Sequence, residues 1–283
     1  MTQKSLRVYS PNDRWKTLER LVHTASIEYS VTDADAFKHL YYRQLKQYPL
    51  YAKWEQFLLD EISQCRTELR VLSYGPGPGI IEGKVVALEN VAYMRLVEPD
   101  NFFRQLSAKS IEDSLSFAGR RTSFDVIEGT AETYRGKGQY DVIMHTATGH
   151  HFPDKKLAYQ NHANALRPGG RLVMTDVMLP EYAFDSETLE PNDLNQFFSL
   201  VLSYIAEQIR GMPDSGNGEV ADQIKTAFQD VLNTGEHKVC LPVVIQCLEE
   251  AGFYNIQTTL FTGQKPGIDW TRYGWWGITA DKT

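Results

Sequence analysis

The fold is decided by the stretch Leu72-Ser73-Tyr74-Gly75-Pro76-Gly77-Pro78-Gly79-Ile80-Ile81, which follows a β-like segment at residues 69–72. Its glycines alternate with other residues, so the backbone can turn sharply and a ligand can approach where no Cβ is present. A helix should follow, and the amides at its N-terminus would then point toward the ligand. This order of strand, turn and helix predicts a ligand-binding loop, although such a loop serves many kinds of ligand.

An acidic residue follows the next predicted strand. Residues 92–97 form a β-like run, and Glu98, Pro99 and Asp100 come directly after it. In a doubly wound sheet this is the position of the carboxylate that binds the ribose hydroxyls of a nucleoside. The alternative interpretation of Glu98 is a surface glutamate at a strand end. Together with the glycine-rich loop, the acid indicates a nucleoside cofactor.

The segments up to residue 176 continue the alternation of strands and helices. A short strand at residues 124–127 leads into small and acidic residues, and residues 140–146 form a buried, apolar strand. A helix over 155–165, a turn over 166–170 and a strand over 171–176 follow. Such alternation predicts an α/β fold with a doubly wound, mostly parallel sheet.

In the order of these motifs, residues 65–180 resemble the class I S-adenosylmethionine-dependent methyltransferases. The resemblance implies a Rossmann-like sheet of seven strands with an antiparallel C-terminal strand. It also implies S-adenosyl-L-methionine as the cofactor. A nicotinamide enzyme fits less well, because Ile80 and Glu82 would face a pyrophosphate unfavourably.

The resemblance assigns the parts of the cofactor to successive segments. Residues 74–79 would hold the methionine part, Glu98 the ribose, and residues 129–132 would border the adenine. The expected cofactor-binding residues are Tyr74, Gly75, Gly77, Gly79, Glu98, Pro99, Thr130, Ala131, Glu132, His145 and Thr146.

Three histidines lie at or after the end of the fourth predicted strand, where ligands bind in such sheets. His150 and His151 are the candidate catalytic residues, since imidazole accepts a proton near neutral pH. The alternative is that they cap the following helix or form local hydrogen bonds. His145, inside the strand end, is expected to be packed or to contact the cofactor. No carboxylate lies at ligand spacing from the histidines, so we expect no metal.

A narrower resemblance links the chain to the histamine N-methyltransferase group. That group shares Ser73, where most class I enzymes have Asp or Glu, and the run Val97-Glu98-Pro99. It implies that the N-terminal segment closes over the substrate and that Glu28 contacts a substrate amine. A solvated helix residue is the alternative for Glu28, and histamine itself is not implied. Trp275, in an aromatic C-terminal segment, is a second candidate for substrate binding.

The chain is expected to comprise four parts: a helical N-terminal lid or substrate segment at 1–64, the cofactor-binding core at 65–180, a helical insertion at 181–236, and the C-terminal part of the core sheet at 237–283. In the first part, Trp54, Phe57 and Leu58 are spaced as one helix face that packs on the sheet. In the last, a helix over 241–251 should end at Gly252, and two strands, over 255–262 and 273–279, should follow. Whether 181–236 is a lid or an interface stays open.

Composition limits the classes of partner. The 283 residues carry a net charge of −7, which argues against a nucleic-acid surface. Three cysteines at irregular spacing are expected to be reduced. No apolar signal region or membrane-spanning stretch is evident, so a cytoplasmic protein with a small-molecule substrate is expected. The oligomeric state is not indicated.

These observations predict an S-adenosylmethionine-dependent methyltransferase that acts on an amine or hydroxyl of a small molecule by in-line transfer. The protein needs mainly to position the reactants and exclude water, because the sulfonium is already activated. The alternative is a protein of the same fold that binds the cofactor but catalyses a cyclisation or rearrangement in natural-product biosynthesis. A noncatalytic partner subunit is disfavoured, since the loop and Glu98 are both intact.

Overall fold

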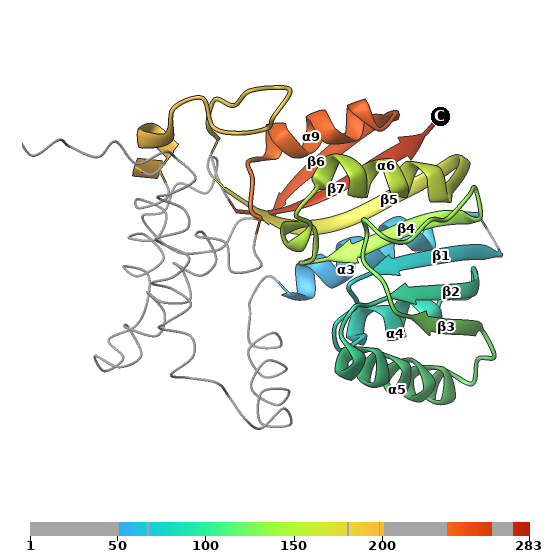
Figure 1. Cartoon of the computed structure of the whole chain (residues 1–283). Coiled ribbons are helices and arrows are strands. Elements are labelled where there is room, and N and C mark those ends of the chain that lie inside the picture. Colours follow the sequence, from blue (N-terminus) through green and yellow to red (C-terminus); the bar gives the residue numbers. More distant parts are fainter. Residues whose placement is uncertain (1–50, 67, 180, 198, 201–236, 262–273) are drawn as a thin grey trace, which may run out of the picture.

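The computed structural model describes residues 51–66, 68–179, 181–197, 199–200, 237–261 and 274–283. Helices and strands alternate over most of this length (Figure 1). In chain order they are α3 (Tyr51–Ser63), β1 (Leu69–Tyr74), α4 (Ile80–Val86), β2 (Val91–Val97), α5 (Asn101–Ala118), β3 (Ser123–Ile127), β4 (Tyr140–Thr146), the short 3-10 helix η1 (Gly149–His151), α6 (Lys155–Ala165), β5 (Leu166–Met178), α9 (Leu241–Glu250), β6 (Phe253–Phe261) and β7 (Gly274–Lys282).

The strands form one seven-stranded sheet in the order β3-β2-β1-β4-β5-β7-β6. The pairs β1–β2, β1–β4, β2–β3 and β4–β5 are parallel, whereas β7 runs antiparallel to both β5 and β6. The mostly parallel sheet with an antiparallel C-terminal strand is therefore confirmed. The strand order reverses between β1 and β4, and ligands bind beyond the carboxyl ends of the strands at such a switch point.

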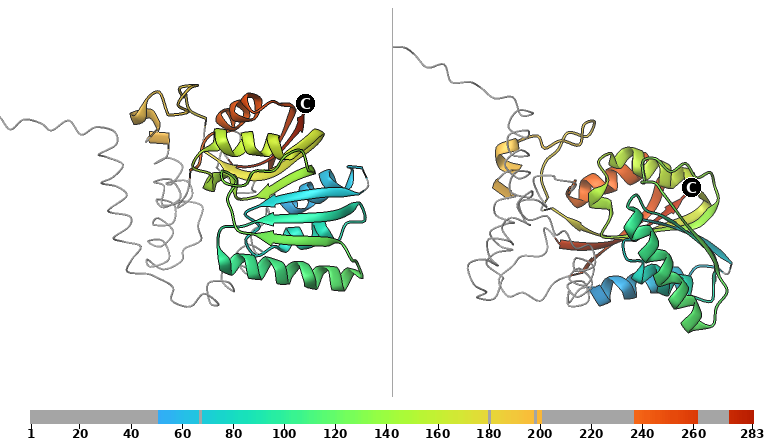
Figure 2. Two further views of the ribbon diagram at one scale, coloured as in Figure 1. Left: turned by 45° about the vertical axis from the view of Figure 1, so that its right-hand side comes forward. Right: turned by 60° about the horizontal axis from the view of Figure 1, so that its bottom comes forward.

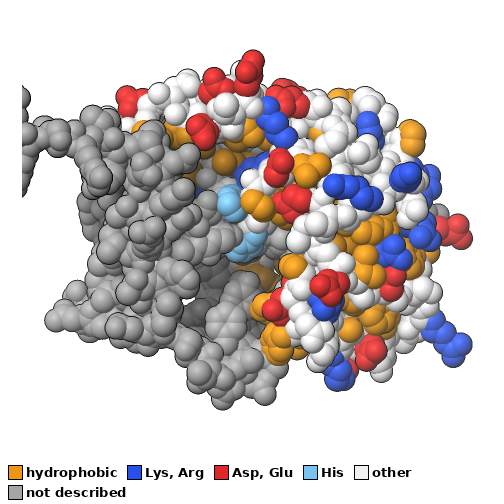
Figure 3. Space-filling view, in the orientation of Figure 1, with side chains coloured by type: hydrophobic (Ala, Val, Ile, Leu, Met, Phe, Trp, Pro, Cys, Tyr) orange, Lys and Arg blue, Asp and Glu red, His pale blue; other side chains and the backbone are white. Residues whose placement is uncertain are grey.

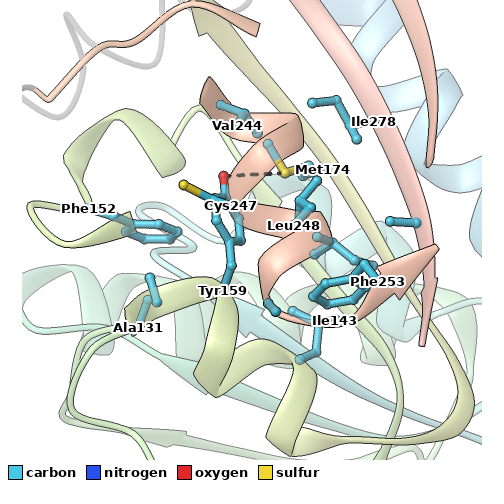
Figure 4. Close-up of a cluster of buried hydrophobic side chains, with 14 of the residues drawn as sticks. Ala131, Ile143, Phe152, Tyr159, Met174, Val244, Cys247, Leu248, Phe253 and Ile278 are labelled. Atoms are coloured by element: carbon cyan, nitrogen blue, oxygen red, sulfur yellow. Dashed lines mark hydrogen bonds between the residues drawn. The ribbon is translucent and has the colours of Figure 1, made fainter. Parts of the chain in front are cut away.

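Helices cover both faces of the sheet (Figure 2). On one face α6 and α9 pack over a buried cluster that includes Leu172 and Met174, and on the other α3, α4 and α5 cover a cluster that includes Val173. Successive residues of β5 thus enter opposite cores, as strand geometry requires. Figure 4 shows the first cluster, in which the Tyr159 hydroxyl of α6 lies 3.8 Å from the Met174 sulfur.

The first described helix, α3, packs on the sheet as its sequence pattern predicts. Trp54 and Leu58 are buried. Phe57 makes an edge contact with Phe261, with ring centroids 5.5 Å apart. The Trp54 ring lies 3.8 Å from that of Trp275. Trp54 and Phe57 of α3 therefore reach the antiparallel end of the sheet.

The predicted turn at residues 166–170 is part of β5 rather than a separate element. Tyr140 pairs with Leu166 and Val142 with Arg171, so the intervening residues bulge out of the ladder. Gly169, at φ 73°, accommodates the bulge. The strand therefore starts earlier than predicted because the chain re-enters the same ladder after the bulge.

Several predicted features lie outside the described residues. They include Glu28, most of the N-terminal lid and most of the insertion at 181–236. In the described part of the chain, no helix is both long and apolar enough to cross a membrane. Cys65, Cys240 and Cys247 are all described and are free thiols, as predicted.

Candidate functional site

A cavity of about 540 Å³ opens at the carboxyl ends of β1, β2 and β4, at the switch point of the sheet. The loops after these strands form most of its wall, and Tyr51 and Trp54 of α3 close one side. On the face shown in Figure 3, histidine side chains lie at a hollow beside hydrophobic and acidic side chains. The cavity has the size of a typical small-molecule site.

The glycine-rich loop between β1 and α4 forms the floor of this cavity. The Gly75 amide donates to the Val97 carbonyl at 2.9 Å, and the Thr148 hydroxyl donates to the Gly75 carbonyl at 3.0 Å. Gly77 has φ +52°, and no atom lies within 4 Å of the place where its Cβ would be. A ligand can therefore approach the backbone at Gly77 closely.

Gly79 differs from Gly77 because it packs against another helix and does not line the cavity. It caps α4 with φ +70°, and a Cβ there would lie 2.7 Å from the Ser107 Cα of α5. Glycine is required because the two helices approach each other at this point. Cofactor contact by Gly79 stays a prediction.

Glu98 lines the cavity and is 5% exposed. One carboxylate oxygen accepts the Gly77 amide at 3.3 Å, and the other accepts the Asp100 amide at 3.0 Å. Burial raises the pKa of Glu98, although these two hydrogen bonds partly offset it. The carboxylate is thus held between the glycine-rich loop and the start of α5, beside the space that a ligand would fill.

Part of the cavity lining carries polar atoms without hydrogen-bond partners among the described residues. Thr130, Ala131 and Glu132 line the cavity next to β4, as does Thr146 at the end of that strand. Three lining atoms are buried and have no hydrogen-bond partner among the described residues: the Tyr74 hydroxyl, one Glu132 carboxylate oxygen and the Thr146 hydroxyl. Buried polar groups are normally paired. Buried polar atoms without a protein partner are consistent with a cavity that binds a polar ligand.

The charged side chains of the cavity wall are mainly acidic. Among the described residues, its lining includes no Lys or Arg, and it carries the carboxylates of Glu82, Glu98, Asp100 and Glu132. His151 is the lining residue that could add positive charge. Such a wall favours a cationic ligand over an anionic one.

The two candidate catalytic histidines occupy different positions. His151 is exposed and lines the cavity, whereas His150 is 8% exposed and lies outside the lining. Their rings are 4.2 Å apart. The His150 Nδ1 lies 2.5 Å from an Asp176 carboxylate oxygen at the end of β5.

The pKa of Asp176 is lowered despite the burial of its carboxyl group. Burial raises its pKa, but the charge and hydrogen bond of His150, with smaller contributions from His145 and the Val177 amide, hold that pKa below its ordinary value. A carboxylate bound to one imidazole nitrogen fixes the orientation and the tautomer of the ring. Asp176 therefore aligns His150 behind His151.

Two other predicted site residues lie outside the lining. His145 is fully buried beside Phe152 and Tyr159, and burial lowers its pKa to about 4. Trp275 stacks on Trp54, which lines the cavity in its place. Direct ligand contact by His145 and Trp275 stays a prediction.

The sequence analysis passed over three contributors to the site. Asp176 lies near the end of β5, and parallel pairing brings that part of the strand beside the end of β4, so its position relative to the histidines was inferable. Glu82 was weighed only as a misfit to a pyrophosphate, yet it lines the cavity. Trp54 was assigned to the core, and nothing in the local pattern distinguishes core packing from a cavity wall.

Comparison with known proteins supports the architecture. Residues 75–174 match a family model described as a methyltransferase domain. A putative methyltransferase of Bacillus halodurans is similar with a TM-score of 0.51 and 15% identity, over 80% of this chain and 97% of that one. An S-adenosylmethionine-dependent methyltransferase of Mesorhizobium loti gives 0.52 and 16%, over 84% and 100% of the two chains.

A more distant likeness has the same architecture. Phosphoethanolamine N-methyltransferase 2 of Haemonchus contortus, solved with S-adenosyl-L-methionine, gives a TM-score of 0.53 at 11% identity, over 82% of this chain and 52% of that one. No curated protein matches the sequence significantly. At these identities the solved structures show a shared fold.

Proposed function

We propose that the chain transfers a methyl group from S-adenosylmethionine to an amine or hydroxyl of a small molecule, because residues 75–174 match a methyltransferase domain model and lie in a doubly wound, seven-stranded sheet. One observation carries the proposal. The acidic cavity at the switch point has the glycine-rich loop and Glu98 on one side and His151 on the other. The residues expected to hold the cofactor and the candidate proton acceptor thus line the same cavity.

The residues of the cavity suit the cofactor. Gly77 leaves its backbone open to a ligand, and the Glu98 carboxylate is positioned by two backbone amides. The unpartnered oxygens of Glu132 and Thr146 offer further polar contacts. S-adenosylmethionine carries a sulfonium and an ammonium group, and the wall has carboxylates and no Lys or Arg among its described residues.

The chemistry that the cofactor supplies is a methyl group activated by a positively charged sulfur, open to in-line displacement. The chain must position the acceptor, exclude water and remove a proton from it. His151 faces the cavity and is the candidate proton acceptor. The ring of His150 lies 4.2 Å from that of His151, and its Nδ1 lies 2.5 Å from an Asp176 carboxylate oxygen, which aligns the His150 ring.

Calorimetric titration with S-adenosylmethionine, S-adenosylhomocysteine and NAD tests the cofactor. We expect micromolar binding of the first two and none of the third; binding of NAD alone would overturn the proposal. Incubation with S-adenosylmethionine and a panel of small amines, phenols and alcohols then tests the reaction. A methylated product with an equal amount of S-adenosylhomocysteine supports methyl transfer, whereas a rearranged acceptor with unspent cofactor contradicts it.

A further inference from the structure

Ser73 and Glu82 form a buried pair beneath the glycine-rich loop. Ser73 is the penultimate residue of β1 and is fully buried, and Glu82 lies in the first turn of α4 with 3% exposure. The Ser73 hydroxyl donates to a Glu82 carboxylate oxygen at 2.9 Å. The loop doubles back between the two residues and brings them together. Glu82 is therefore a deeply buried acid on the wall of the cavity.

Among the described residues, no Lys or Arg lines the cavity beside Glu82, and no cation contributes to the shift of its pKa. Of the elements around α4, β1 presents Ser73, the end of β2 presents Glu98, and α3 and α5 present Trp54 and Phe103 to the same cavity. Glu98 is the charged group whose field acts on Glu82. An ionised carboxylate in such a place is costly unless a cation pairs with it.

The protonation of Glu82 reflects this environment. Burial raises the pKa of Glu82, its backbone hydrogen bond and that from Ser73 lower it, the charge of Glu98 raises it, and the net pKa is about 7. Near neutral pH the carboxyl group is therefore divided between its protonated and ionised forms. A bound cation would favour the ionised form.

We propose that Glu82, oriented by Ser73, binds the ammonium group of the cofactor's amino-acid part, and that binding releases the proton of Glu82 to solvent. The inference rests on the function proposed above. Its balance is simple: the carboxylic acid becomes a carboxylate, an ammonium–carboxylate pair forms, and the proton leaves with the buffer. Affinity for the cofactor should thus rise with pH across the range in which Glu82 ionises.

The test is calorimetric titration of the full chain with S-adenosylhomocysteine between pH 6 and 7.5, in buffers that differ in ionisation enthalpy. This ligand carries the ammonium group without the sulfonium, which isolates the proposed contact. We expect affinity to rise roughly eightfold over this interval and about half a proton to be released at pH 7, from a pKa of about 7. Pronounced binding without proton release or pH dependence would refute the inference.

Two variants separate a ligand contact from a structural role. Glu82→Gln should weaken S-adenosylhomocysteine at least tenfold at pH 7.5 and abolish the pH dependence, while the analogue that lacks the amino group binds both proteins equally. Glu55→Gln is the matched control, because Glu55 of α3 pairs with Lys84 and does not line the cavity. It should keep the affinity and pH dependence of the unmodified chain.

The failures of the two proposals can be told apart. If the unmodified chain does not bind S-adenosylhomocysteine at any pH, the proposed function itself fails. If it binds and Glu82→Gln weakens the amino-free analogue equally, Glu82 only supports the fold and the ammonium subsite is refuted. The proton count needs no variant, so the inference stays testable if Glu82→Gln does not fold.

Discussion

At the residue scale, the candidate proton acceptor is His151, which lies next to a buried pair formed by His150 and Asp176. His151 is exposed in the lining, its ring is 4.2 Å from that of His150, and His150 is held by Asp176. The three residues come from the turn after β4 and from the end of β5. A base that faces the cavity, backed by an aligned ring, suits the removal of a proton from an amine or hydroxyl.

We therefore expect His151→Ala to lower turnover by about a hundredfold, the size typical of lost general-base catalysis, with cofactor affinity changed by less than about twofold. Methyl-transfer kinetics and S-adenosylhomocysteine titration of the same variant check both parts. Asp176→Asn should also reduce turnover and alter its pH profile, because His150 loses its anionic partner. A fall in affinity alone in His151→Ala would remove His151 from any acid–base role.

Glu98→Ala should weaken cofactor binding by about 1–3 kcal/mol, because charge-assisted hydrogen bonds are lost. Part of that loss would come from the Gly77 and Asp100 amides, which the Glu98 carboxylate now accepts. The control is Glu128→Ala, since Glu128 follows β3, is exposed and pairs with Arg104 outside the cavity lining. Calorimetry measures the affinity of both variants for the cofactor, and equal affinities would exclude Glu98 from the site.

At the scale of elements, the loop between β1 and α4 combines two requirements. Gly79 is needed for packing, because α5 passes so near that a Cβ would meet Ser107. Gly77 has open space around it, so its lack of a Cβ serves the ligand instead. Of the three alternating glycines, Gly75 and Gly79 therefore satisfy packing constraints, against Thr148 and Ser107, and Gly77 satisfies a ligand-facing one.

This difference predicts the behaviour of Gly77→Ala. The residue has φ +52°, so the alanine should destabilise the fold by about 1 kcal/mol and also weaken cofactor binding about tenfold or more. Gly119→Ala is matched to it, since Gly119 caps α5 at φ +64° with equally open space but lies outside the cavity lining. Denaturant unfolding should give similar losses for both variants. A similar loss of affinity in both would contradict the ligand-facing role of Gly77.

At the scale of the whole molecule, the cavity joins segments that are distant in the sequence. Trp54 of α3, the loop at Gly77, Glu98, Ala131 and His151 all face it. They belong to α3 and to the segments that follow β1, β2, β3 and β4. A ligand in the cavity would therefore contact the core from several sides and bind only the folded chain.

Ligand binding should accordingly stabilise the fold. At a concentration one hundred times Kd, S-adenosylhomocysteine should contribute about 2.7 kcal/mol to the free energy of unfolding. For a domain of this size, that corresponds to a rise in Tm of roughly 5 to 10 °C. Scanning calorimetry measures the shift, with adenosine monophosphate as the comparison ligand. A Tm that does not move with S-adenosylhomocysteine would contradict the site.

The local pattern predicted elements better than it predicted contacts. The strand over 140–146 and the helix over 155–165 have the predicted bounds, because hydrophobic runs and end signals act within a few residues. The turn at 166–170 was separated from its strand, since only the pairing with β4 shows that the ladder resumes after the bulge. His150 and His151 are neighbours that the sequence did not distinguish, yet one is buried and the other lines the cavity.

What the sequence determined by itself is the alternation of strands and helices, the glycine-rich loop and the acid after the second strand. These signals are short-range, and they were sufficient for the class of fold and cofactor. The tertiary structure alone decided that Asp176 aligns His150, that Trp54 and not Trp275 lines the cavity, and that Glu82 is buried against Ser73 with no counterion from the part of the chain that is described. Each depends on side chains that meet across different elements, and burial, which shifts the pKa of a carboxyl group, exists only once those elements have packed.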